Sequence, residues 1–370
     1  MQRVIVRKAD YELSMLRSVL FETIDSLTDP PVEPGSRVLI KPNLLIPAKP
    51  DRGIVTHPLV VKAVAEYFIA RGASVTIQDS PAVGSFERVL KESRYTEILG
   101  DLPVKMAPFA ESVRVNIGDP FGAVDIARDA IEADRVINIA KLKTHSQMLL
   151  TLGVKNTFGC IVGYRKPEWH FRSGVDRFLF AKLLTQIHRA VRPALTIVDG
   201  ILALEGQGPG KRGTPRKIGA IYAGIHAPAV DAAICKTLGI DPNLLPTHLA
   251  AKSLGLIDDP VRIDGDIPAV RGLRLPVLAP LTFGPKRFHG FIRKHLLQRP
   301  ALDRDICRRC GECWKYCPAK AIAPKTEAPS FDYGKCIRCY CCIEVCPHGA
   351  LHAKETVPGR LIRKLPVFNR

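Results

Sequence analysis

Two copies of one cysteine pattern decide the fold of the last quarter of the chain: Cys307-Arg-Arg-Cys310-Gly-Glu-Cys313-Trp-Lys-Tyr-Cys317-Pro318 and Cys336-Ile-Arg-Cys339-Tyr-Cys-Cys342-Ile-Glu-Val-Cys346-Pro347. The second copy begins 29 residues after the first. Of the eleven cysteines in the chain, nine lie between Cys307 and Cys346. A secreted disulfide scaffold would distribute its cysteines along the whole chain. This clustering therefore predicts metal ligands rather than disulfides.

The spacing within each copy is typical of iron–sulfur proteins of the bacterial ferredoxin type. Three cysteines two residues apart supply three thiolates from one loop, and the fourth cysteine of each run ligates the other cluster. Zinc also uses paired cysteines, but it requires neither the third cysteine nor the fourth one before a proline. We therefore expect a small α+β domain with two 4Fe–4S clusters, one held by Cys307, Cys310, Cys313 and Cys346, the other by Cys336, Cys339, Cys342 and Cys317.

Cys341 is the ninth cysteine of this region and stands beside Cys342. Only Cys342 keeps both spacings of the pattern, so Cys341 is not expected to be a ligand. Two interpretations stay open for it. Cys341 is either a small packed residue or a redox-active thiol next to a cluster.

The charge of the chain is concentrated at its C-terminal end. The formal net charge is +18, and residues 286–370 alone contain 18 Lys and Arg against 7 Asp and Glu, a net of +11. Cations beside the ligand loops favour reduction of a negatively charged cluster, so we expect a raised reduction potential. The same charge suits an acidic redox partner protein. Nucleic acid is disfavoured as a partner because no recognisable binding motif accompanies the charge.

The first 280 or so residues alternate short Val- and Ile-rich runs with amphipathic stretches of helical period, which predicts an α/β domain with a largely parallel sheet. The predicted strands are Val4–Val6, Arg37–Ile40, Ser74–Ile77, Val136–Ile139, Leu195–Val198 and Ile218–Tyr222. The predicted helices include Tyr11–Leu27, Pro58–Arg71, Val175–Val191 and Pro228–Leu238.

Ligands of such folds bind at the carboxyl ends of the parallel strands. Polar residues follow four of the predicted strands, and lysines among them would form a site for a carboxylate or phosphate. For each lysine the alternative is a solvated surface charge. The candidates for catalysis are Lys141, Lys143 and His145, with His145 as a general acid; His57 and His170 are further candidates. The candidates for binding an anionic substrate are Lys41, Asn43, Lys155, Asn156, and Gly206 and Gly208 of a glycine-rich loop.

The domain boundaries follow from these patterns. We expect an α/β domain over residues 1–283, a basic amphipathic linker over 284–297, a ferredoxin-type domain over 298–357 with repeats 298–327 and 328–357, and a basic tail over 358–370. The linker either packs as a helix on the α/β domain or contacts a membrane surface. No run of about 18 apolar residues predicts a membrane span, and the N-terminus does not resemble a signal peptide. A cytoplasmic location is expected, because a reducing compartment suits thiolate ligands.

Several short motifs of the α/β domain together resemble one known family. They are Leu39-Ile-Lys-Pro-Asn-Leu44, Thr56-His-Pro58, Asp79-Ser-Pro81, Lys141-Leu-Lys-Thr-His145, Gly153-Val-Lys-Asn-Thr-Phe-Gly159, Val198-Asp-Gly200, Glu205-Gly206-Gln-Gly-Pro209 and Val230-Asp231. In these the chain resembles the domain-of-unknown-function 362 family, many members of which carry a two-cluster module at the C-terminus. The resemblance implies this architecture but assigns no catalytic role to any residue.

The function expected from these observations is that of an iron–sulfur oxidoreductase. Electrons would pass through the two clusters to an anionic small molecule at the strand ends of the α/β domain. The alternative is a non-enzymatic electron carrier or assembly factor that docks an acidic protein.

Overall fold

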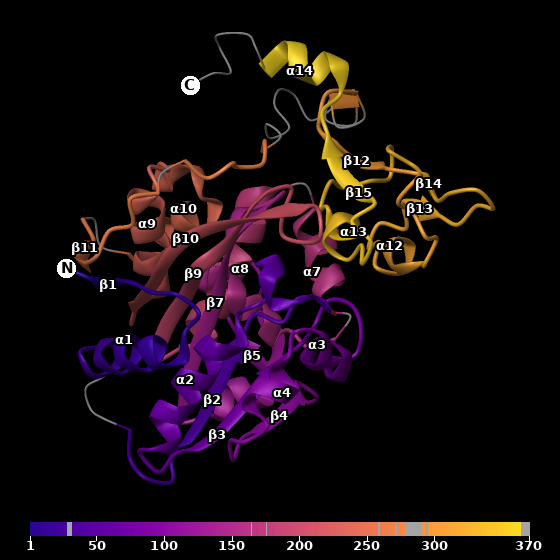
Figure 1. The fold of residues 1–370 in the computed structure, drawn as a ribbon. Coiled ribbons are helices and arrows are strands. Elements are labelled where there is room, and N and C mark those ends of the chain that lie inside the picture. Colours follow the sequence, from indigo (N-terminus) through magenta and orange to yellow (C-terminus); the bar gives the residue numbers. More distant parts are fainter. Residues whose placement is uncertain are drawn as a thin grey trace.

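The computed structural model describes residues 1–27, 32–163, 165–174, 176–257, 260–270, 272–278, 291–292 and 295–363. In this part of the chain nine strands form one large sheet, in the order β11-β1-β10-β9-β7-β2-β3-β4, with β8 paired to β7. The central strands β9, β7, β2, β3 and β4 run parallel, whereas β10 is antiparallel to both β1 and β9. The sequence-based prediction of a largely parallel α/β sheet is confirmed (Figure 1).

The elements of the α/β domain have the following bounds. The strands of the large sheet are β1 Arg3–Lys8, β2 Arg37–Pro42, β3 Ser74–Asp79, β4 Lys105–Pro108, β7 Arg135–His145, β8 Leu149–Thr151, β9 Leu195–Gly206, β10 Gly213–Gly224 and β11 Arg262–Gly265, and a separate hairpin consists of β5 Ser112–Asn116 and β6 Ala123–Ala127. The helices are α1 Leu13–Asp25, α2 Pro58–Ile69, α3 Phe86–Glu92, α4 Tyr95–Leu99, α5 Arg128–Glu132, α6 Gly153–Asn156, α7 Arg165–Ser173, α8 Arg177–Val191, α9 Ala227–Thr237 and α10 Pro246–Ser253.

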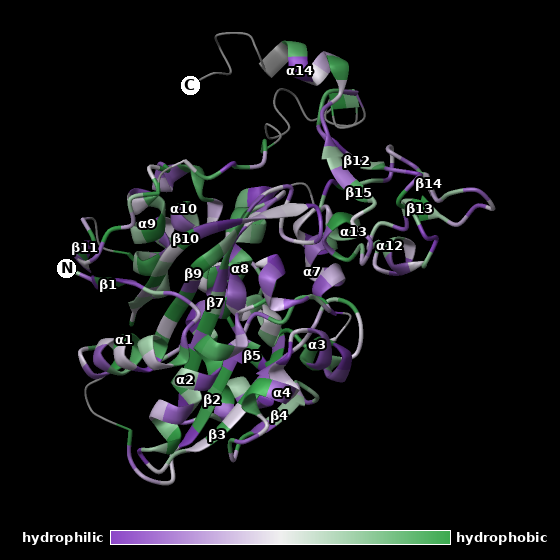
Figure 2. Cartoon of the chain, in the orientation of Figure 1, coloured by the Kyte–Doolittle hydropathy of each residue, from purple (hydrophilic) through white to green (hydrophobic). Residues whose placement is uncertain are grey.

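Alternation along the strands builds a core on each face of the sheet. On β2, Val38 and Ile40 pack with α1 and α2, whereas Leu39 points to the opposite face and packs with α8. Successive side chains of a strand point to opposite faces, so a strand covered on both sides is apolar at every position. Figure 2 shows this apolar interior in the central strands. No helix in the described residues is long and apolar enough to cross a membrane.

The C-terminal module is small and has two structurally similar halves, as its repeated sequence predicts. Each half places a one-turn helix after its first cysteines. Its elements are β12 Arg299–Leu302, α12 Glu312–Lys315, β13 Ile322–Ala323, β14 Ser330–Phe331, α13 Cys341–Glu344 and β15 Leu351–Lys354, followed by α14 Val357–Arg363. β12 pairs with β15, and β13 pairs with β14. Most of the predicted linker (284–290, 293–294) and residues 364–370 of the predicted tail lie outside the described residues.

Candidate functional site

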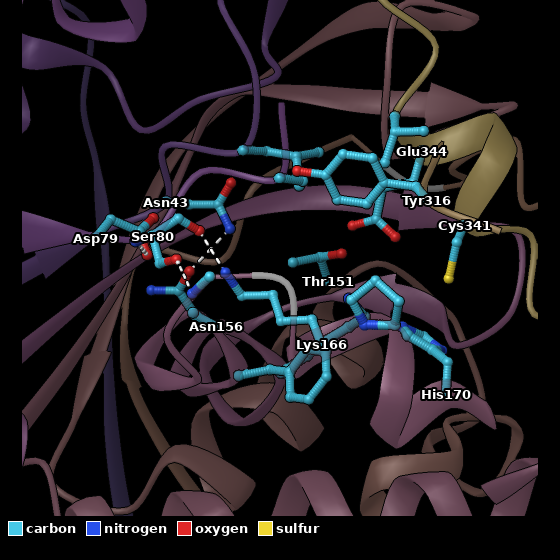
Figure 3. A pocket seen from close by; sticks show the side chains of 18 of the residues that line it. Asn43, Asp79, Ser80, Thr151, Asn156, Lys166, His170, Tyr316, Cys341 and Glu344 are labelled. Carbon is cyan, nitrogen blue, oxygen red and sulfur yellow. Dashed lines mark hydrogen bonds between the residues drawn. The ribbon is translucent and has the colours of Figure 1, made fainter. Parts of the chain in front are cut away.

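A cleft lies between the α/β domain and the C-terminal module, at the carboxyl ends of β2, β3 and β7. The cleft and its solvent-filled mouth together hold about 710 Å³ of space not filled by atoms. One wall comes from the α/β domain, and the other consists of Tyr316, Cys341, Glu344 and Val345 of the module (Figure 3). Val345 and Tyr316 also pack into the core that β2, α1 and α2 share. The module is therefore part of the site and not merely an attached domain.

Lys41 and Asp79 form a buried ion pair at one end of the cleft. β2 and β3 are parallel neighbours, so the last residues of the two strands lie side by side. Lys41 Nζ is 2.8 Å from Asp79 Oδ1, and the carboxylate also accepts the backbone N–H groups of Leu44 (2.7 Å) and Ser80 (2.8 Å). Gly159 covers the pair, and a Cβ there would lie 2.3 Å from Asp79 Oδ1. The absence of a side chain at Gly159 is therefore a requirement of the site.

A chain of amides holds Lys143 in the floor of the cleft. Lys143 Nζ donates to Asn43 Oδ1 and to the carbonyl of Ile54, both at 2.7 Å. Asn43 in turn donates to Asn156 Oδ1 at 2.8 Å, and Asn156 donates to Asn138 Oδ1 at 2.8 Å. Burial lowers the pKa of Lys143 well below its usual value. Because its partners are neutral oxygens, no carboxylate balances the charge of this ammonium directly.

Two further lysines of the cleft also lack a carboxylate partner within hydrogen-bond distance. Lys155 on α6 is 8% exposed, and among the described residues no hydrogen-bond acceptor or ion-pair partner contacts its amine. Lys166 on α7 donates only to the carbonyl of Ser80, at 2.5 Å. Burial lowers the pKa of both lysines, that of Lys166 to about 8. The four lysines of the cleft outnumber its two carboxylates, Asp79 and Glu344, so the cleft favours an anion.

His145 faces the module from the end of β7. Its Nδ1 accepts the backbone N–H groups of Gln147 (3.1 Å) and Met148 (3.2 Å), so the neutral ring carries its proton on Nε2. Nε2 is 3.6 Å from Glu344 Oε2, a contact longer than a hydrogen bond. Burial lowers the pKa of His145 to about 4. Burial would raise the pKa of Glu344, but Lys155 and His145 lower it below its usual value. A neutral histidine thus faces a carboxylate across the domain boundary.

His170 is a second buried histidine of the cleft. It is 4% exposed, its ring centre is 4.2 Å from that of Phe180, and its Nδ1 has no hydrogen-bond partner among the described residues. Burial lowers its pKa to about 3, so the neutral ring is the stable form. The Nδ1 atom is shielded from solvent, so His170 contributes to the wall of the cleft without offering Nδ1 at its surface.

The other candidates from the sequence lie elsewhere. Lys141 does not line the cleft; it is fully buried, with Nζ 2.7 Å from Asp199 Oδ2 and 2.8 Å from the Tyr11 hydroxyl. His57 stacks on Tyr11 with ring centres 3.7 Å apart, at a separate surface groove. Lys141 therefore belongs to a structural network with Asp199 of β9 and Tyr11.

The glycine-rich stretch forms the hairpin between β9 and β10 and does not line the cleft as an anion-binding loop. The Gly208 N–H donates to Thr144 Oγ1 (3.3 Å), and its carbonyl accepts from Ser146 Oγ (3.0 Å). A Cβ at Gly208 would lie 2.3 Å from the Thr144 carbonyl oxygen, which explains the glycine. Next to Gly206, the side chain of Gln207 exchanges two hydrogen bonds with the backbone of Ala353. The hairpin thus seats the module on the α/β domain.

The cysteines of the module line two separate cavities. One contains Cys307, Cys310, Cys313 and Cys346, and the other contains Cys317, Cys336, Cys339, Cys341 and Cys342. No three His, Cys, Asp or Glu side chains within the described ranges converge on a single point as ligands of one metal ion do. The thiolates of a cubane bind different irons and stand farther apart. The two sulfur-lined cavities have the donor set that 4Fe–4S clusters require.

Several residues of the cleft were absent from the sequence-based prediction. Glu344, Tyr316 and Lys166 were missed, and Cys341 was left with two interpretations. Glu344 and Tyr316 lie within the cysteine runs, where spacing identifies ligands but does not indicate which loop residues face another domain. Lys166 precedes Pro167 on α7, and its sequence carries no signal of this role.

Comparison with known proteins identifies the families that the two parts of the chain match. Residues 38–236 match the family described as "Domain of unknown function (DUF362)", and residues 299–347 match a 4Fe-4S dicluster domain. The chain is 36% identical over 303 residues to the thylakoid-associated protein sll1697 of Synechocystis sp., an alignment that covers 80% of this chain and 94% of that protein. Lactate racemase apoprotein from Thermoanaerobacterium thermosaccharolyticum is a distant structural neighbour (TM-score 0.38, 11% identity), with 60% of this chain covering 54% of that one. The chain belongs to the DUF362 family and carries a C-terminal domain that binds iron–sulfur cofactors.

Proposed function

We propose that the protein is an iron–sulfur oxidoreductase that transfers electrons to or from an anionic small molecule held in the cleft. Two 4Fe–4S clusters would be held by Cys307, Cys310, Cys313 and Cys346, and by Cys336, Cys339, Cys342 and Cys317. When bound, such clusters supply one-electron transfer. The observation that carries the proposal is the position of Cys341, which lines both the cleft and the second cysteine cavity. One side chain therefore separates a proposed cluster from the lysine-lined cleft.

The two cysteine groups differ in exposure in a way that suits directional electron transfer. In the first group Cys310 is exposed, as are its neighbours Arg308 and Arg309. In the second group Cys339 and Cys342 are buried. We propose that an acidic redox protein docks beside Cys310, because the exposed arginines there complement negative charge. Electrons would then enter at the outer group and reach the cleft from the inner one.

The residues of the cleft have defined parts in this proposal. Lys155 and Lys166 bind the anion, because their ammonium groups lack carboxylate partners. Lys143 is held by Asn43 and adds a third positive charge at the floor. His145 does not line the cleft itself; its neutral ring turns Nε2–H toward the Glu344 carboxylate and positions that residue at the cleft wall.

The test begins with anaerobic purification and a count of iron and acid-labile sulfide, for which two cubanes predict about eight of each per chain. The electron paramagnetic resonance spectrum of the reduced protein is then recorded with and without oxalate as a dianion probe. Oxalate should perturb the signal of one cluster in the wild type but not in Lys143→Met. Lys62→Met, which removes a lysine paired with Asp101 outside the cleft, should behave as wild type. An unperturbed wild-type spectrum would contradict the proposal.

A second candidate function is that of an electron carrier or assembly factor that docks an acidic protein. The exposure of Cys310 among arginines favours it. It predicts that substitutions at Arg308 and Arg309 abolish partner binding, while Lys143→Met leaves every function of the protein intact.

We further propose a location in a reducing compartment, with peripheral contact to a membrane surface. Thiolate ligands require reducing conditions. The relative from Synechocystis is named as thylakoid-associated, and residues 286–370 carry the net +11 that an anionic lipid surface attracts. Recovery of the protein in the soluble fraction at low salt would contradict the membrane contact.

A further inference from the structure

Cys341 brings a thiol to the wall of the cleft. We propose that Cys341 is a redox-active nucleophile and that the substrate is a disulfide bearing a negatively charged group. This inference rests on the proposed function and names the substrate class for the same cleft. Its starting point is that Cys341 is the cysteine shared by the cleft and the inner cysteine cavity.

The orientation of Cys341 supports a chemical role. It opens α13, the helix that faces the α/β domain. Figure 3 shows the Cys341 sulfur and the Glu344 carboxylate both directed from the module toward the α/β wall of the cleft, with His170 opposite. Cys341 and Cys339, one of the proposed ligands, line the same inner cavity. A ligand atom bonded to Cys341 Sγ would thus be held beside the inner cysteine group.

An independent observation indicates where the rest of the ligand binds. Lys155 is more than nine-tenths buried, lines the cleft, and has no hydrogen-bond or ion-pair partner among the described residues. Its charge acts on Cys341 and Glu344 within the same cleft. A buried ammonium held without a partner costs free energy unless a ligand anion completes it. A carboxylate or phosphate on Lys155 therefore brings the remainder of the ligand to the thiol.

The reaction is balanced without a second protein thiol. Cys341 Sγ forms a bond with one sulfur of the disulfide as the S–S bond of the ligand breaks, and the thiolate that leaves takes up the proton that Cys341 has lost. Two electrons and two protons then cleave the mixed disulfide and release the second thiol and free Cys341. The reductant is an external low-potential one-electron donor protein, which acts through the iron–sulfur module.

The surroundings of Cys341 explain why electrons, and not a resolving cysteine, complete the cycle. Apart from the proposed ligands, the other cysteines are Cys160 and Cys235, both fully buried. Neither lines the described cleft. A mixed disulfide at Cys341 thus meets no attacking thiolate from the protein.

The experiment measures the adduct directly. Anaerobically purified holoprotein is mixed with 5,5′-dithiobis(2-nitrobenzoate), an anionic disulfide, or with the neutral 2,2′-dithiodipyridine, and the modified cysteine is mapped by mass spectrometry. The expected result is an adduct at Cys341 that forms faster with the anionic reagent, and that loses this preference in Lys155→Met. Reduced methyl viologen should then regenerate the free thiol.

Cys341→Ser and the matched control Cys235→Ala separate this inference from the proposed function. Cys341→Ser should retain its iron and sulfide but give neither adduct nor disulfide turnover, while Cys235→Ala should match wild type. Disulfide turnover that persists in Cys341→Ser, or modification that spares Cys341 in the wild type, would overturn the inference and leave the oxalate result standing. If oxalate has no spectral effect on the wild type, the proposed function fails, and this inference fails with it.

Discussion

Replacing Lys155 with methionine should weaken anion binding while leaving the fold almost unchanged. Methionine has nearly the shape of the lysine stem, and Lys155 has no hydrogen-bond partner among the described residues that the change would orphan. Burial already lowers the pKa of Lys155, so its charge is penalised in the folded protein. We expect a change in the free energy of unfolding of less than about 1 kcal/mol. A lost charge-assisted hydrogen bond of about 1.5–3 kcal/mol corresponds to a roughly 10- to 150-fold loss of affinity.

Lys41→Met is the matched control, because it removes a lysine of the same cleft that is paired. Breaking the buried ion pair with Asp79 leaves that carboxylate uncompensated, which costs about 3–5 kcal/mol. Asp79 also accepts hydrogen bonds from two backbone N–H groups, which would still stabilise its carboxylate. We therefore expect a cost at the lower end of this range. Thermal unfolding and calorimetric titration with oxalate, both under anaerobic conditions, measure the two effects. Equal loss of stability in both variants, with unchanged oxalate affinity in Lys155→Met, would refute the assignment of Lys155 as a ligand-binding residue.

Three further predictions concern other parts of the molecule. Burial lowers the pKa of His188 on α8 to about 4, so the folded protein keeps this histidine neutral at pH values where the unfolded chain takes up a proton. The free energy of unfolding is therefore full above about pH 6.5 and falls by up to about 1.4 kcal/mol per pH unit toward pH 4. His188→Gln should make that slope shallower in pH-dependent denaturation, and an unchanged slope would contradict this. Arg212 donates hydrogen bonds to the Gly349 carbonyl and, at 2.9 Å, to Asp303 of the module. Arg212→Ala should therefore weaken the docking of the module by about 1–3 kcal/mol and speed its proteolytic release. Equal release rates in the variant and the wild type would count against this. Arg308→Gln removes an exposed cation next to a proposed ligand. In a redox titration it should lower the reduction potential of one cluster, on the order of tens of millivolts by Coulomb's law. A raised potential would contradict the role of the cation.

The core of the fold was predictable because its signals are local. Short Val- and Ile-rich runs gave six strands of the sheet, and the structure contains a strand at each of them. Their ends were less predictable. The expected strand Val136–Ile139 extends to His145 as β7, because β8 returns beside it as a hairpin partner. Residues expected in a loop after the strand, Lys141 and Lys143 among them, are therefore strand residues on one face.

The site was only partly predictable for a related reason. The ends of parallel strands account for the meeting of Lys41, Asn43 and Lys143, since topology alone determines that edge, and Lys155 and Asn156 join them from α6. Composition suggested that lysines are solvated, whereas these three are at most 8% exposed. Burial of a lysine depends on what covers it, and here part of the cover comes from a domain more than 150 residues further along the chain. A sequence pattern of period two or 3.6 contains no information about such a contact.

The role of the glycine-rich hairpin follows from the same contact. Its glycines predicted a loop that binds an anion through backbone amides, but in the structure Gly208 packs on Thr144 and the hairpin supports the module. Close backbone approach is the common requirement of both roles. The sequence can therefore indicate that something approaches closely at Gly208, but not whether it is a ligand or another part of the protein.

The composition of the cleft links ligand binding to the association of the two domains. Lys143 and Lys155 belong to the α/β domain, whereas Cys341 and Glu344 belong to the module, and all four face one space. An anion that contacts both walls binds the docked arrangement of the two domains more tightly than an undocked one. It must therefore stabilise docking by a free energy equal to this difference in binding free energy. The Arg212→Ala variant, which weakens docking without touching the cleft, should accordingly bind oxalate more weakly, and oxalate should slow proteolytic release of its module. Redox chemistry at the cleft would then proceed only when the module is in place, because the wall that carries Cys341 also completes the binding site.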